Sequence, residues 1–149
     1  MSRTLLRTVV VRIGSYGSFM ATEFQISFDA NDPPKLAGFW AQALGYVEQP
    51  PPPGFPTWEE WATKNNIPFE SADDYAALID PDGKGPRFLF QRVPEGKTAK
   101  NRMHLDVRAG LDSVDRLVAL GATRVREHND QTGHWVVMLD PEGNEFCVS

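Results

Sequence analysis

The stretch that decides the fold is the last ten residues of the chain, Asp140-Pro-Glu-Gly-Asn-Glu-Phe-Cys-Val-Ser149. An Asp-Pro-x-Gly turn reverses the chain there, and a short apolar strand ends it. The same turn occurs earlier as Asp80-Pro-Asp-Gly83, followed by the strand-like run Arg87-Phe-Leu-Phe-Gln91. Proline at the second turn position fixes φ, and glycine adopts the left-handed geometry that other residues avoid. Two copies of one hairpin predict a duplicated unit.

The duplication extends beyond the turns. Alternating patterns predict equivalent strands over Gln25–Asp29 and His104–Arg108, and helical spacing predicts helices over Leu36–Leu44 and Val114–Leu120. Both helices end in Leu-Gly. The offset between the copies is 79 residues at the first strand (25 to 104) and 60 at the turn (80 to 140), because the first copy holds an insertion. The sequence therefore predicts two βαβββ modules, at about residues 22–93 and 101–149.

This pattern resembles the vicinal oxygen chelate superfamily, which includes glyoxalase I, extradiol dioxygenases and the fosfomycin and bleomycin resistance proteins. The resemblance covers about residues 22–149. It rests also on Phe39-Trp40 in the first helix and on the ending Gly-Asn-Glu-Phe-Cys-Val. It implies an α+β fold in which the two βαβββ modules form a curled mixed-sheet cup with the helices outside. Trp40 falls on the apolar stripe of its helix, which favours core packing over ligand contact.

Composition limits the classes of function. A net charge of −5 argues against a nucleic-acid partner, which a basic patch would indicate. No apolar run approaches the ~20 residues of a membrane helix, so no membrane partner is expected. The single cysteine, Cys147, excludes an internal disulfide and agrees with a cytoplasmic location.

Residues 1–19 differ from the domain predicted over residues 20–149. They contain Arg3, Arg7 and Arg12 and no acidic residue. A signal peptide is the alternative, but Arg12 interrupts the apolar run Val9–Val11 and no small-residue cleavage site follows. We interpret this segment as an N-terminal extension outside the family fold.

The insertion in the first module spans Glu48–Phe69. Pro50–Pro53 predicts an extended arm, and Thr57 with Glu60 forms a capping box that starts a short helix. Trp58 and Trp61 lie on one side of that helix. Two interpretations stay open: the indoles close a lid over a pocket, or they attach the insertion to the sheet.

The resemblance implies metal ligands on the first and last strands of each module. The first position falls on Gln25 and its equivalent on His104, while Cys147 takes the place of the usual Glu. The remaining position falls on Leu89, or on Gln91 if the match slides by two. This set has no carboxylate, so it lacks charge compensation and the general base of glyoxalase-type isomerisation. We therefore expect no cofactor; a divalent metal, if bound, would use Gln25 and His104.

The second module's first strand has a polar and an apolar face. Arg102, His104 and Asp106 share one face, and Met103 shares the other with the following apolar residues. The polar face suits a pocket wall or an internal ion-pair network, and we favour either over metal ligation by His104. Cys147 sits in an apolar strand, where a small buried hydrophobe is a better interpretation than a nucleophile.

The sequence thus predicts a glyoxalase-like protein with a degenerate metal site that binds a small molecule in the cup and forms a homodimer. One alternative is a metal-dependent isomerase, lyase or dioxygenase with a rearranged ligand set. Another is a protein that sequesters a drug or toxin. The predicted ligand-binding residues are Gln25, Trp58, Trp61, Gln91, Arg102, His104 and Cys147.

Overall fold

The structure is a computed structural model that describes residues 22–68 and 71–149. The N-terminal extension predicted over residues 1–19 lies outside the described residues.

The first repeat forms a four-stranded mixed sheet, called sheet A here, in the strand order β1-β4-β3-β2. Strands β1 and β4 are parallel, and the other neighbours are antiparallel. Its elements are β1 (Gln25–Ala30), α1 (Pro33–Leu44), β2 (Val47–Glu48), β3 (Tyr75–Ile79) and β4 (Arg87–Arg92), with α2 (Trp58–Lys64) and a 3₁₀ turn (Ala72–Asp74) in the insertion.

The second repeat forms sheet B in the order β5-β8-β7-β6, again with a parallel pair, β5 and β8, at one end. Its elements are β5 (Leu105–Val107), a 3₁₀ turn (Leu111–Ser113), α3 (Val114–Ala119), β6 (Thr123–Asp130), β7 (Gly133–Leu139) and β8 (Glu145–Val148). The matching order of the two sheets confirms the α+β class and the two βαβββ modules.

The residues that mark the repeat act as the sequence predicts. Gly83 and Gly143 have positive φ values of 67° and 88°, and each donates its N–H to the carbonyl of the turn aspartate at 2.9 Å. Gly45 caps α1 in the left-handed region, with φ 72°. At the other end of α1, the Asp32 side chain accepts from the Lys35 N–H, and proline follows at the first position.

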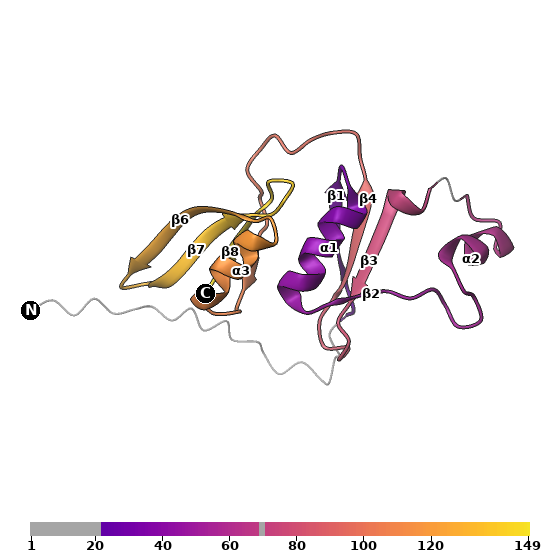
Figure 1. Ribbon diagram of the computed structural model, residues 1–149, viewed down its shortest axis with the longest axis horizontal. Coiled ribbons are helices and arrows are strands. Elements are labelled where there is room, and N and C mark those ends of the chain that lie inside the picture. Colours follow the sequence, from indigo (N-terminus) through magenta and orange to yellow (C-terminus); the bar gives the residue numbers. More distant parts are fainter. Residues whose placement is uncertain (1–21, 69–70) are drawn as a thin grey trace, which may run out of the picture.

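Helix α1 lies between the two sheets (Figure 1), and its aromatic side chains join them. The Trp40 ring is 5.7 Å from that of Phe28 in β1 and 5.1 Å from that of Phe146 in β8. Trp40 is 1% exposed, which confirms its predicted core role. One hydrophobic core therefore spans both modules.

Each sheet keeps an open face on the side away from this core, because alternate residues of a strand point to opposite faces. In β4, Phe88 and Phe90 are buried, whereas Leu89 is only half-buried. In β8, Phe146 and Val148 are buried and Cys147 is half-buried. The two sheets do not close into a single cup within the chain.

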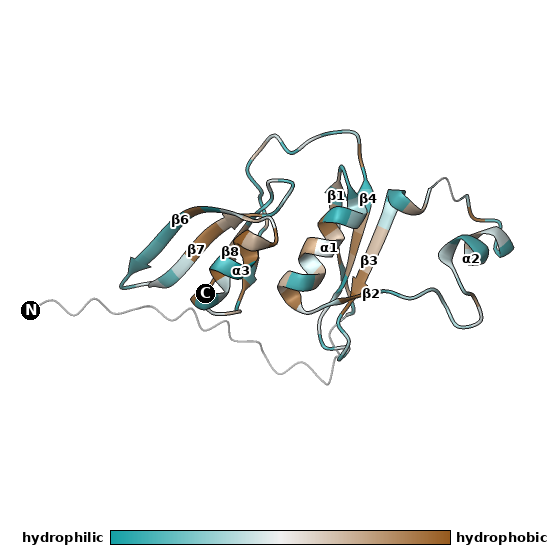
Figure 2. Cartoon of the chain, viewed as in Figure 1, coloured by the Kyte–Doolittle hydropathy of each residue, from teal (hydrophilic) through white to brown (hydrophobic). Residues whose placement is uncertain are grey.

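Helix α2 stands apart from α1 and sheet B, at the opposite end of the molecule (Figure 1). Figure 2 shows it and β6 as mostly hydrophilic, in contrast with the hydrophobic strands beside α1. Among the residues that the structure describes, no helix is long and apolar enough to cross a membrane.

Candidate functional site

A cleft of about 900 Å³ lies between the modules. It is lined by Gln25 and Asp29 from β1, by His104 just before β5, and by Asn144 and Glu145 after the final turn. The two residues that begin the predicted metal set, Gln25 and His104, thus face the same cleft.

On the module-one side of the cleft, the polar row of β1 lies beside the apolar lining residues Phe24, Ile26 and Phe28 and is hydrogen-bonded to side chains of β4. The Gln25 Oε1 accepts from the Arg87 Nη1 at 2.7 Å, and the Gln91 Nε2 donates to the Asp29 Oδ1 at 2.8 Å. A guanidinium beside the Gln25 oxygen disfavours a cation there, because like charges repel. Gln25 is therefore better placed to contact an uncharged polar group than to hold a metal.

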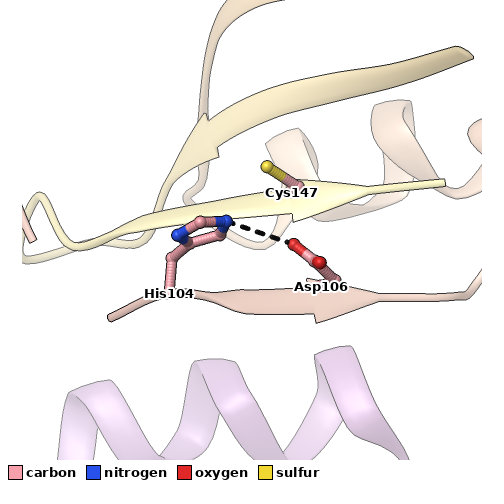
Figure 3. Close-up of side chains that lie close together, drawn as sticks. All are labelled: His104, Asp106 and Cys147. Carbon is pink, nitrogen blue, oxygen red and sulfur yellow. Dashed lines mark ion pairs between the residues drawn. The ribbon is translucent and has the colours of Figure 1, made fainter. Parts of the chain in front are cut away.

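His104, Asp106 and Cys147 form a cluster on the open face of sheet B. Strand pairing sets Asp106 beside Cys147, and His104 lies two residues before Asp106 on the same side. The His104 Nε2 is 3.4 Å from the Asp106 Oδ1, and one ligand atom from each of the three residues lies within 4.8 Å of the other two. Figure 3 shows the three side chains projecting to the same side of the two strands.

The thiol of this cluster is not set up as a nucleophile. Burial, followed by the negative charge of Asp106 and a hydrogen bond to it, raises the pKa of the Cys147 thiol. A thiol with a raised pKa is mostly protonated at neutral pH, and only the thiolate is a good nucleophile.

Glu145, the carboxylate two residues before the usual ligand position in β8, already has a structural role. It accepts a hydrogen bond from the Asn101 N–H at 3.0 Å and pairs with the Lys97 ammonium at 3.0 Å. These contacts, the Asn101 bond first, lower the pKa of Glu145 to about 2. The carboxylate therefore fixes the segment that connects the modules.

The other predicted site residues are spread more widely. Arg102 is exposed in a bend before β5. The Trp58 Nε1 donates to the Gln49 carbonyl at 3.2 Å, and the Trp58 ring packs edge-on against Trp61 at 5.5 Å. Since α2 lies far from sheet B, these two indoles do not meet His104 within one chain (Figure 1).

Strand pairing resolves the open choice for the fourth family position. Ser27 pairs with Leu89 in sheet A just as Asp106 pairs with Cys147 in sheet B. Leu89, rather than Gln91, is thus the equivalent of Cys147, and it has no ligand atom. The four family positions therefore do not fit a metal as a set. The sequence placed Asp106 on the polar face with His104 but did not assign it as a ligand, although its place two residues after His104 was a usable signal.

Two modules of this topology, each with an open polar sheet face, define the vicinal oxygen chelate class of folds. The family model described as a glyoxalase-like domain matches residues 25–149, and the chain belongs to this family. A search of curated proteins found no significant match.

Solved structures show the same fold at low sequence identity. FosX from Mesorhizobium loti, a fosfomycin resistance protein, is 10% identical with a TM-score of 0.57, over 87% of this chain and 91% of its own. A variant of FosX from Listeria monocytogenes, complexed with Mn(II) and 1S,2S-dihydroxypropylphosphonic acid, is 13% identical with a TM-score of 0.58, over 87% and 90%.

A glyoxalase/bleomycin resistance protein/dioxygenase family enzyme from Burkholderia phytofirmans is 19% identical with a TM-score of 0.54, over 83% of this chain and 94% of its own. At these identities the likeness establishes the fold, and function must be argued from the residues of this chain.

Proposed function

We propose that this protein binds a small polar molecule in the cleft between its modules, with Gln25 and His104 as polar contacts. The observation that carries the proposal is that the first strands of both modules line one cleft of about 900 Å³. That volume is within the range of small-molecule sites. Exposed amide and imidazole groups on two facing walls supply both donors and acceptors.

The charge of the cleft selects among ligands. Its described lining carries four carboxylates, Asp29, Glu95, Glu142 and Glu145, against the lysine Lys97. Walls of one sign raise the local concentration of molecules of the opposite sign. The cleft therefore suits a neutral molecule, or a cationic one whose charged group lies towards these carboxylates and away from the Arg87 guanidinium beside Gln25, better than a free phosphonate such as fosfomycin. Sequestration of a cationic drug or toxin agrees with the same observation.

The open faces of the sheets support a homodimer. Leu89 in sheet A and Val137 in sheet B are half-buried apolar residues on these faces. A second copy that covers them would complete a closed cup from two open sheets. In that arrangement Trp58 and Trp61 on α2, which lies far from sheet B within one chain, would reach a ligand from the second copy, whereas Gln91 and Arg102 stay predicted contacts. A cytoplasmic location stays a prediction from the single cysteine.

The binding proposal is tested with a fragment library sorted by charge, screened by thermal shift and titration calorimetry on the purified protein, with fosfomycin as the anionic probe. We expect neutral and cationic hits whose affinity falls in Gln25→Ala and in His104→Ala. The matched control is His134→Ala, an exposed histidine that does not line the cleft. Hits that are mainly anionic, or that bind all three variants equally, would refute the proposal.

A further inference from the structure

We propose that His104, Asp106 and Cys147 form a binding site for a thiophilic divalent cation, Zn²⁺ above all. The site lies wholly on sheet B and uses no residue of the first module. It shares His104 with the expected pair but replaces Gln25 with Asp106 and Cys147, both on sheet B. The proposal does not depend on the small-molecule function argued above.

The backbone brings the three ligands together. Parallel strands β5 and β8 place Asp106 and Cys147 in register, and neighbouring strands are ~4.8 Å apart. The ligand atoms already lie within 4.8 Å of one another, and the His104 Nε2 and the Asp106 Oδ1 are 3.4 Å apart. Ligand atoms that bind one tetrahedral ion at about 2.0–2.3 Å stand somewhat closer to one another than 4.8 Å. Rotations of side chains alone can close the remaining gap.

The site is open enough to exchange ions and ligands. The side chains of His104 and Asp106 are 45% and 65% exposed, and Figure 3 shows all three residues projecting from one side of the two strands. Three protein ligands leave a fourth tetrahedral position for water or for a polar molecule. The side-chain motion required for binding is therefore unobstructed by core packing.

The ligand chemistry selects the metal. Imidazole, carboxylate and thiolate together suit Zn²⁺ and Co²⁺, whereas Mn²⁺ prefers oxygen ligands. On binding, the thiol proton of Cys147 passes to solvent. The thiolate and the Asp106 carboxylate then balance the two charges of the cation. The four family positions contain no carboxylate, and Asp106, which is not one of them, supplies it.

The ion pair alone does not account for the cluster. A His–Asp pair this exposed contributes little to stability. Beside this pair lies Cys147, the single cysteine of the chain, whose Sγ points to the same side. Its presence beside the pair is what distinguishes a metal site from an ordinary surface contact.

The test is titration of chelator-treated, reduced full-length protein with Co²⁺ and with Zn²⁺ alone. We expect one Zn²⁺ per chain by calorimetry and a thiolate-to-cobalt charge-transfer band in the near ultraviolet. Mn²⁺ should bind at least about tenfold more weakly than Zn²⁺. Cys147→Ser should abolish the charge-transfer band, and Asp106→Asn and His104→Ala should each weaken Zn²⁺ binding by at least about tenfold.

The matched control is His134→Ala, which removes an exposed histidine paired with Glu127 at 2.6 Å on the β6–β7 hairpin. This variant should bind Zn²⁺ as the parent does. Circular dichroism of every variant establishes that it is folded, and Cys147→Ser changes one atom at a half-buried position. The absence of a charge-transfer band in the parent, or equal Zn²⁺ affinity in Cys147→Ser, would overturn the proposal. Failure of the fragment screen would leave it unaffected.

Discussion

Asp140 is a nearly buried carboxylate at 3% exposure that links the final turn to α1. It accepts from the Trp40 Nε1 at 3.1 Å and from the N–H groups of Glu142 and Asn144 at 3.0 and 2.9 Å. Its counterpart Asp80 accepts from three turn N–H groups but is more exposed and receives no indole. The same motif therefore has a purely local role in one module and a role between modules in the other.

Asp140→Ala should cost about 3–5 kcal/mol of unfolding free energy, because it leaves the buried Trp40 N–H and two turn N–H groups without partners. Urea unfolding followed by tryptophan fluorescence measures the loss. Asp80→Ala is the matched control and should cost about 1 kcal/mol, because water can replace the carboxylate at an exposed turn. Equal losses in the two variants would contradict the distinct role of Asp140.

Glu145 makes stability depend on pH. Its pKa is lowered from 4.5 to about 2, so its ionised form stabilises the fold fully above about pH 4.5. That contribution disappears as the pH falls from 4.5 towards 2. In Glu145→Gln, the unfolding free energy should fall by about 1–2 kcal/mol at about pH 6 and by much less at about pH 2. Urea unfolding of both proteins at the two pH values tests this, and a variant equally destabilised at both would contradict it.

At the scale of elements, local patterns predicted most of the structure. The period-2 run at Gln25 and the Asp-Pro-x-Gly turns fall where the sequence placed them, because they depend on neighbouring residues. Met103, which the alternation placed on the face of the following apolar residues, is 88% exposed, because β5 begins only at Leu105. Val118 in α3 is 44% exposed, whereas Val114 and Leu117 of the same helix are buried.

Both interpretations of α2, lid and attachment, stay predictions. We expect Trp58 to stabilise the fold and Trp61 to contact a ligand. Trp58 is held by its hydrogen bond to the Gln49 carbonyl next to β2, whereas Trp61 contacts Trp58 by an edge-on ring. Trp58→Ala should therefore lower the melting temperature. Trp61→Ala should instead weaken binding of a fragment hit by about 1–3 kcal/mol. Unchanged affinity in Trp61→Ala, with a loss of about 3–5 kcal/mol of stability, would rule the lid out.

At the scale of the molecule, the resemblance predicted one cup, and the chain forms two separate sheets joined through α1 (Figure 1). Sequence patterns could not fix this, because the docking of modules depends on contacts between distant residues. The pair of hydrogen bonds from the N–H groups of Asn31 and Asp32 to the Glu142 carboxylate, each 2.8 Å, is one such contact. The cluster of His104, Asp106 and Cys147 depends likewise on a distant contact, the pairing of β5 with β8.

Open sheet faces with half-buried apolar residues predict that the 16.7 kDa chain is a dimer in solution. Light scattering at micromolar concentration should give about twice the chain mass. Leu89→Asp places a charge on the open face of sheet A, and it should shift the protein towards monomer because a buried unpaired charge costs several kcal/mol. Val118→Asp, on the exposed side of α3, is the control and should leave the mass unchanged. A monomeric parent protein would refute the dimer, and a dimer unaffected by Leu89→Asp would place its interface away from sheet A.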